Sequence, residues 1–235
     1  MRTLAKSKFA RCVAAGSPRE HDILMNRRII SRRWLLLGGG CIAAACLVFA
    51  LRTRAAAADE IPKLAALMEW KPVTIVADIG AGDGSYAFAA AERVSAAGKV
   101  FATEIDTDKL NSLRAEIKKR DLQNVVVLES GEAVTNLPDG CCDAIFLRRV
   151  YHHLTKPLEF DASLMRSLKP GGKLAIIDFP PHPEYGKVKG VPKDREDHGI
   201  QREILIEELT KAGFQLDKIA DDWPTSDYCV LFVKK

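Results

Sequence analysis

A glycine-rich turn after a buried strand is the feature that most limits what this chain can fold into. The segment from Val76 to Gly84 reads VADIGAGDG, which predicts a β-strand ending in three closely spaced glycines, with a helix beginning near Ser85. Glycine lets the backbone turn tightly and approach a ligand that a Cβ would block. The free amides at the start of the following helix favour an anionic or polar group. The segment therefore predicts a ligand site at this turn.

A carboxylate follows at the end of the next predicted strand. Residues 99–104 read KVFATE, and Glu104 lies twenty residues after Gly84. At that distance, at the tip of a second parallel strand, a carboxylate is placed to accept hydrogen bonds from two ribose hydroxyls. The two motifs together predict a site for an adenosine-containing cofactor.

The glycine spacing and the acid before it distinguish between cofactors. The glycines follow G-x-G-x-G, whereas the dinucleotide fingerprint is G-x-G-x-x-G. Asp78 lies just before the turn, where its charge would repel a pyrophosphate and attract a cationic sulfonium ligand that carries a free ammonium group. A sulfonium cofactor is therefore favoured over a nicotinamide dinucleotide.

This pattern resembles the first motif of the class I S-adenosylmethionine (SAM) methyltransferases, and three further segments agree with that family in order and spacing. Residues 124–133 resemble the third strand with its adenine-side acidic turn, 137–147 the loop into strand four, and 168–174 the turn into strand five. The resemblance covers roughly Ile61 to Lys235. It implies SAM as cofactor and an α/β, Rossmann-like, seven-stranded, mostly parallel sheet with a C-terminal antiparallel strand pair.

Hydrophobic periodicity agrees with alternating strands and helices, which implies a parallel sheet covered on both faces. Strands are expected near 73–79, 99–104, 125–129, 143–148, 173–179, 214–219 and 228–233. Helices are expected near 59–70, 85–97, 107–120, 157–168 and 201–212. Residues 179–198 are rich in proline and glycine and are expected to form a loop.

The cofactor site is expected to combine the glycine turn with acids from the neighbouring strand ends. The predicted cofactor-binding residues are Asp78, Gly80, Gly82, Glu104, Glu132, Ala133 and Arg148. Glu129 is an alternative to Glu132, and Ala133 would offer its backbone amide to the adenine edge. Either Arg148 or Arg149 would pair with the cofactor carboxylate or with an anionic substrate.

The segment after strand four points to the class of acceptor. Residues 148–154 read RRVYHHL and lack the Asn/Asp-Pro-Pro-Tyr/Phe form of the family's amino-methylating enzymes. The His-His pair resembles small-molecule methyltransferases, including the ubiquinone/menaquinone C-methyltransferases, and implies a small or lipid-like acceptor.

The family resemblance implies no fixed catalytic set, because methyl transfer mainly requires alignment and exclusion of water. His152 or His153 is a candidate base or substrate hydrogen-bond donor; capping of a strand end is the alternative role for each. His198 is expected in a solvated charge cluster rather than in a lid, and Asp178 is a candidate for the cavity wall.

Charge and cysteine usage exclude other classes. Residues 1–58 carry eleven Lys/Arg against two acids, so the whole-chain charge of +4 leaves residues 59–235 at −5. A nucleic-acid partner is not expected, because such domains usually present a basic face. The six cysteines are expected to be reduced, mostly buried thiols. No metal-ligand spacing is present among cysteines and histidines, so no metal is expected.

The N-terminal part divides by composition into a basic segment (1–33), an uncharged apolar run of eighteen residues (34–51) and a linker (52–58), before a domain over 59–235. The run reaches the lower length limit of a membrane span, so a single-pass N-terminal anchor is expected. The motif SRRWLL at 31–36 also fits a twin-arginine export signal, and residues 1–16 fit an organelle transit sequence. Met25 is an alternative start that would give a more ordinary n-region.

These features together predict a SAM-dependent methyltransferase of a small or lipid-like molecule, placed at a membrane by residues 34–51. A membrane-tethered, non-catalytic SAM-binding or assembly factor is the alternative, and a nicotinamide oxidoreductase is a third.

Overall fold

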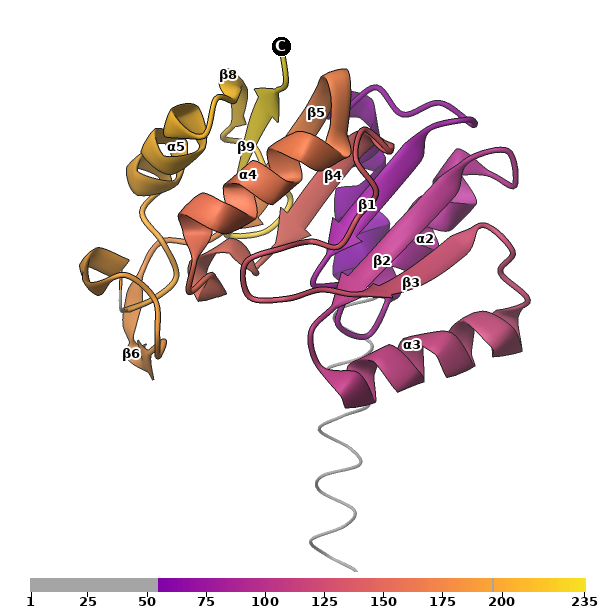
Figure 1. Cartoon of the computed structure of the whole chain (residues 1–235), viewed down its shortest axis with the longest axis horizontal. Coiled ribbons are helices and arrows are strands. Elements are labelled where there is room, and N and C mark those ends of the chain that lie inside the picture. Colours follow the sequence, from indigo (N-terminus) through magenta and orange to yellow (C-terminus); the bar gives the residue numbers. More distant parts are fainter. Residues whose placement is uncertain (1–54, 196) are drawn as a thin grey trace, which may run out of the picture. The chain divides into compact units, whose positions relative to one another are not determined.

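A computed structural model describes residues 55–195 and 197–235 (Figure 1). Within them, seven strands form one sheet in the order β3-β2-β1-β4-β5-β9-β8. The five strands β1 to β5 are parallel, and β9 runs antiparallel to both of its neighbours, β5 and β8. The strands are β1 (Ile75–Ile79), β2 (Lys99–Glu104), β3 (Val125–Glu129), β4 (Cys142–Arg148), β5 (Leu168–Asp178), β8 (Gln215–Ala220) and β9 (Tyr228–Val233). The predicted seven-stranded sheet with its C-terminal antiparallel pair is confirmed.

Helices cover both faces of this sheet (Figure 1). On one face lie the helical residues 55–67, α2 (Ser85–Val94) and α3 (Thr107–Arg120). On the other lie α4 (Pro157–Ser167) and α5 (Arg202–Lys211). The start of α3 shows how the sequence sets a helix boundary: the Asp106 carboxylate accepts hydrogen bonds from the amides of Asp108 and Lys109.

The core is divided between the two faces by the side-chain alternation of the strands. In β4, Phe146 packs with the cluster under residues 55–67 and α2, whereas Ile145 and Leu147 pack with the cluster under α4 and α5. All three side chains are fully buried. Burial on both faces explains why the central strands are continuous apolar runs rather than alternating ones.

This topology brings the ends of three parallel strands to one edge. β1 pairs with β2 on one side and with β4 on the other. Gly80, Glu104 and Arg148, which follow or end these strands, therefore lie at the same carboxyl edge. In open α/β sheets a ligand site forms where the strand order reverses, and here that place is beside β1.

One predicted boundary and one predicted loop differ from the structure. Residues 55–58, assigned to a linker, are helical, and Ala57 is 2% exposed because the helix packs onto the sheet before its expected start. The expected loop over 179–198 contains a small antiparallel pair, β6 (His182–Lys187) with β7 (Asp197–His198), and a 3-10 turn, η2 (Lys193–Arg195). The strand signal was hidden because β7 is two residues long and β6 is almost entirely exposed.

The cysteines differ in part from the expected reduced thiols. Cys141 and Cys142 are joined by a disulfide at the entrance to β4, where chain adjacency holds their Cα atoms 3.7 Å apart. Cys229 in β9 is a buried free thiol, as expected.

The predicted membrane segment, residues 34–51, lies outside the described residues, as do residues 1–33 and the alternative start at Met25. Among the helices that the structure describes, none has the length and apolar character needed to cross a membrane.

Candidate functional site

A cavity of about 480 Å³ opens at the carboxyl edge of the sheet, beside β1. Its wall includes five of the seven residues predicted to bind the cofactor: Gly80, Gly82, Glu104, Glu132 and Arg148. The other two, Asp78 and Ala133, do not line it. The volume falls within the range typical of small-molecule sites in proteins.

Glu104 is held in place by backbone amides. One carboxylate oxygen accepts a hydrogen bond from the Gly82 amide at 3.0 Å, and the other accepts one from the Ile105 amide at 2.9 Å. The residue is 5% exposed, so its orientation is fixed by the fold rather than by solvent. A preorganised carboxylate of this kind is suited to accept hydrogen bonds from the hydroxyl groups of a ligand.

The first two glycines of the turn serve different purposes. Both have positive φ values, +72° at Gly80 and +57° at Gly82. A Cβ at Gly80 would lie 2.5 Å from the Val150 side chain, so this glycine is required by packing. A Cβ at Gly82 would meet only the Gly80 carbonyl oxygen within 4 Å among the described atoms, at 3.9 Å. Because Gly82 lines the cavity, this Cβ would occupy cavity space. Gly82 therefore keeps space free for a ligand.

Substituting Gly82→Ala is expected to weaken SAM binding at least about tenfold, since the new methyl group occupies ligand space. The left-handed backbone itself costs about 1 kcal/mol in stability. Gly140→Ala is the matched control, because Gly140 has φ +59°, no described atom within 4 Å of its added Cβ, and no place in the cavity wall. Chemical denaturation should show similar stability losses for both variants. Calorimetry should show lost affinity in Gly82→Ala alone; equal affinities would contradict the assignment.

Asp78 lies under the turn rather than in the cavity wall. It is 2% exposed, and none of the described residues hydrogen-bonds to its Oδ2 atom. Burial, reinforced by the nearby charges of Asp83 and Glu104, raises the pKa of Asp78 from 3.8 to about 8. The unsatisfied buried oxygen and this protonation are both consistent with a position that gains from a nearby cationic ligand.

The raised pKa predicts a pH-dependent stability. Below about pH 4 the Asp78 carboxyl is protonated in both the folded and the unfolded chain. Between about pH 4 and pH 8 only the unfolded chain releases the proton. The free energy of unfolding therefore falls as pH rises through this window. In the wild type the free energy of unfolding should fall by on the order of 1 kcal/mol per pH unit over this window, and Asp78→Asn should abolish this fall. Urea unfolding of ligand-free protein at pH 5, 6.5 and 8 measures it. Asp139→Asn, at an exposed aspartate, should follow the wild type; an unchanged slope in Asp78→Asn would refute the effect.

Arg148 lines the cavity but is fixed by other protein groups. Its guanidinium donates two hydrogen bonds to Glu60, both at 3.0 Å, and the Glu60 side chain is fully buried. Arg149 forms a similar two-point contact with Asp227. Arg149 is therefore paired, although its side chain is 45% exposed. The sequence left open which arginine meets a ligand; both line the cavity, and both are already held by carboxylates.

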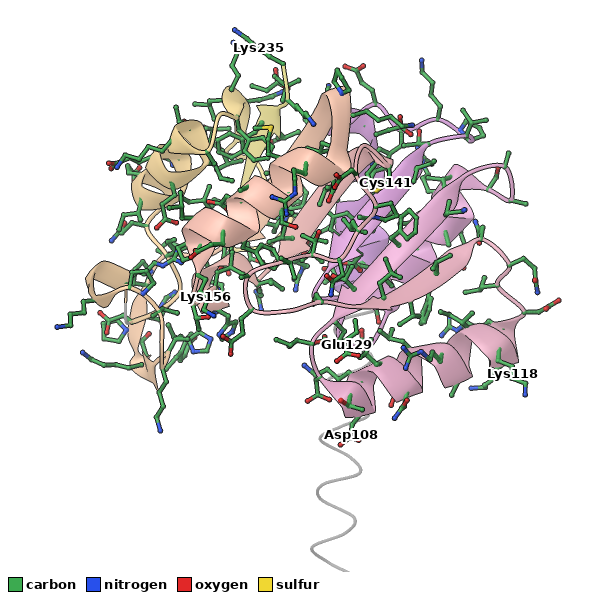
Figure 2. The ribbon with its side chains drawn as sticks, in the orientation of Figure 1. Asp108, Lys118, Glu129, Cys141, Lys156 and Lys235 are labelled. Atoms are coloured by element: carbon green, nitrogen blue, oxygen red, sulfur yellow. A yellow bond between two sulfur atoms is a disulfide. The ribbon has the colours of Figure 1, made fainter. Side chains whose placement is uncertain are left out.

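The turn after β3 contributes mainly backbone to the cavity. Ser130 and Gly131 line it, and the Ser130 amide donates to the Glu104 carbonyl at 2.9 Å. Glu132 is also in the wall, but its side chain is 62% exposed and lies 3.5 Å from Lys156. Glu129, the alternative, is exposed and outside the wall. In Figure 2 Glu129 and Lys156 are labelled above α3, which carries Asp108 and Lys118.

The histidines after β4 lie at the other end of the cavity, in a short 3-10 turn, η1 (Tyr151–His153). His153 lines the cavity, whereas His152 is 1% exposed and bonded through Nδ1 to the Asp178 carboxylate at 2.8 Å. Partial desolvation of the His153 ring, with the positive charges of His152 and His198 when protonated, lowers its pKa from 6.5 to about 4. Asp178 therefore supports a histidine instead of lining the cavity, and His153 is neutral at physiological pH.

His198 is not in the expected solvated charge cluster. Its ring packs against Phe179 with centroids 5.8 Å apart, and against His152 at 4.9 Å. The sequence signal was masked because the residues around His198 are mostly charged. One of them, Arg195, is 3% exposed and donates to Glu208 of α5 and to the Leu154 carbonyl, both at 2.8 Å. This anchor holds the segment before His198 against the domain.

Comparisons with known proteins agree with this arrangement. Residues 77–176 match the family model described as a methyltransferase domain. A solved SAM-dependent methyltransferase from Aquifex aeolicus is similar at 29% sequence identity and a TM-score of 0.60, covering 73% of this chain and 87% of that one. Over residues 77–176 the chain is thus similar to methyltransferase domains, and its described part has the fold of a SAM-dependent methyltransferase.

The chain spans about half the length, or less, of the curated relatives that it matches. The demethylmenaquinone methyltransferase of Listeria welshimeri is 27% identical over 112 residues, 48% of each chain. The chloroplastic 2-phytyl-1,4-beta-naphthoquinone methyltransferase of Arabidopsis thaliana is 29% identical over 108 residues, 44% of this chain and 41% of the relative.

SAM is the cofactor that the matched family and the fold imply, and the cavity fits it. Gly82 leaves open space in the wall, Glu104 presents a fixed carboxylate, and Asp78 is a buried acid with an unsatisfied oxygen nearby. Gly82 and Glu104 suit the ribose side of SAM, and Asp78 suits its positive charge.

Proposed function

We propose that the chain transfers a methyl group from SAM to a small, lipid-like acceptor. The observation that carries this proposal is the continuity of the cavity, whose wall includes both the cofactor-side residues Gly82 and Glu104 and the histidine His153. A single enclosure for both reactants is what direct transfer requires. The quinone substrates named for the relatives support an acceptor with an aromatic or quinone-like ring and an apolar tail.

Each part of the wall has a role in such a reaction. SAM supplies an electrophilic methyl group, and Glu104 would hold its ribose. Ile79, Leu154 and Phe160 give the cavity apolar surface, which would exclude water and favour an apolar acceptor. His153, neutral because of its lowered pKa, would accept a hydrogen bond or a proton from an acceptor hydroxyl. Attachment to a membrane through residues 34–51 belongs to the same proposal and rests on the sequence alone.

The test is methyl transfer from radiolabelled SAM by the full chain to a panel of acceptors: a demethylated naphthoquinol, a demethylated benzoquinol with an isoprenoid tail, and tail-less versions of both. We expect label in the tailed quinols, with less in the tail-less ones. Binding of SAM without transfer to any acceptor would indicate the alternative, a SAM-binding factor. Displacement of SAM by NAD would instead indicate an oxidoreductase.

A further inference from the structure

Three histidine side chains from two separate segments meet beside the cavity. His152 and His153 belong to η1 after β4, and His198 ends β7. The ring centroids of His152 and His153 lie 4.0 Å apart, and those of His153 and His198 lie 5.2 Å apart. One potential ligand nitrogen from each residue lies within 4.8 Å of the other two. Imidazole nitrogens gathered in this way are the preferred ligands of zinc and related divalent ions.

The two ring nitrogens of His152 differ in their surroundings. Its Nδ1 atom is bonded to Asp178, and the same carboxylate accepts the backbone amides of His152 and Phe179. Nε2 of His152 is buried, and nothing in the described part of the chain hydrogen-bonds to it. A buried polar atom without a partner is costly, and a metal ion would satisfy it. A carboxylate behind the other ring nitrogen is the usual support of a metal-bound histidine.

We propose that His152, His153 and His198 bind one divalent transition-metal ion, with zinc as the expected occupant. Three neutral nitrogen ligands match the number found in open zinc sites, in which a fourth position is left for water or substrate. Asp178 would act as a positioning residue that fixes the ring of His152 and presents Nε2 to the ion.

Binding requires a small contraction of the cluster. Zinc–nitrogen bonds of about 2.1 Å in a tetrahedral site place the ligand atoms about 3.4 Å apart, which is less than the present limit of 4.8 Å. His152 is fixed by Asp178, whereas His153 is exposed and His198 is half-buried. Contraction would therefore rely on rotation of these two rings, while Arg195 anchors the backbone before His198.

The site would serve the acceptor side of the cavity, a step that rests on the proposed function. His153 is in the cavity wall, so an ion bound to it would lie next to the acceptor. In the metal-bound protein this open position, instead of the His153 ring, would take a hydroxyl or deprotonated oxygen of the acceptor, and the ion would favour its anionic form.

The test uses the full chain after treatment with a chelator. Zinc is titrated in competition with a chromophoric chelator, bound metal is counted by elemental analysis, and cobalt is added as a visible-absorption probe. We expect one ion per chain and a cobalt spectrum typical of four- or five-coordination. His198→Ala should weaken zinc affinity at least about tenfold, and Asp178→Asn should weaken it about 10- to 100-fold, as supporting carboxylates do elsewhere.

His182→Ala is the matched control, because His182 lies on the same segment, bonds to Glu184 and is outside the cluster. It should bind zinc like the wild type. SAM calorimetry on His198→Ala confirms that the variant is folded, since His198 does not line the cavity. Absence of bound zinc, or equal affinity in His198→Ala and the wild type, would overturn the metal site. SAM binding and methyl transfer by metal-free protein would leave the proposed function standing in that case.

Discussion

Glu104→Ala is expected to weaken SAM binding by about 100-fold or more. A carboxylate that accepts two hydroxyl hydrogen bonds contributes roughly 1.5–3 kcal/mol through each, and about 3 kcal/mol corresponds to a hundredfold change in affinity. The variant also leaves the amides of Gly82 and Ile105 without their acceptor, which loosens the glycine turn. Calorimetric titration of the full chain with SAM measures the effect.

Glu129→Ala is the matched control for this experiment. Glu129 is paired in register with Glu104 on the neighbouring strand, but it is exposed and outside the cavity wall. It should bind SAM like the wild type. Glu104→Gln, which keeps one accepting oxygen, should fall between the two. Equal losses in Glu104→Ala and Glu129→Ala would mean that the strand end, rather than the Glu104 carboxylate, supports the ligand.

Glu60→Ala is expected to lower the free energy of unfolding by about 3 kcal/mol, because it removes one partner of a buried ion pair. Glu60 is fully buried, and Arg148 would be left with Asp227, 3.6 Å away, as its remaining carboxylate partner in the described structure. Arg148 also lies over the Tyr86 ring, 4.7 Å from its centroid, so its displacement would disturb the start of α2. Urea unfolding followed by circular dichroism measures the loss.

Two further variants test whether the stability loss in Glu60→Ala comes from leaving a buried charge unpaired or simply from removing a charge. Glu116→Ala removes an acid from an exposed helical pair with Arg120 and should leave stability nearly unchanged. The double variant Glu60→Leu, Arg148→Met should recover much of the lost stability, since an apolar pair of similar size avoids an unpaired buried charge. A double variant as unstable as Glu60→Ala would show that packing, not the unpaired charge, causes the loss.

The fold was predictable because its signals are local and repeated. Apolar runs such as residues 144–147, separated by helical stretches, identify buried parallel strands with few alternatives. The start of the first helix was missed because residues 55–58 consist of alanine alone, and their burial depends on tertiary packing. The pair between β6 and β7 was missed because two residues carry no strand pattern.

The two ends of the site differed in how well the sequence predicted them. Gly82 and Glu104 belong to motifs whose spacing reflects backbone geometry, so their positions follow from the chain itself. The grouping of His198 with His152 depends on how a long connection folds back, and no local spacing encodes that return. The partners Glu60 and Asp227 were likewise hidden, because each lies far along the chain from the arginine it holds.

The first and last residues of the described domain lie at opposite ends of the parallel strands. Glu60, in the first helix, contacts Arg148 at the carboxyl end of β4, which is the cavity edge. Glu69, just after that helix, contacts Lys173, which pairs with Ala144 near the start of β4. The first helix therefore begins at the cavity edge and runs away from it. Lys173 also pairs with Val233, and Figure 2 places Lys235 opposite Glu129 and Lys156. A protein immobilised on a sensor surface through Lys235 would thus present its cavity to the solution. One attached just before residue 55 would instead bring the carboxyl edge of the sheet, where the cavity opens, nearer to the support.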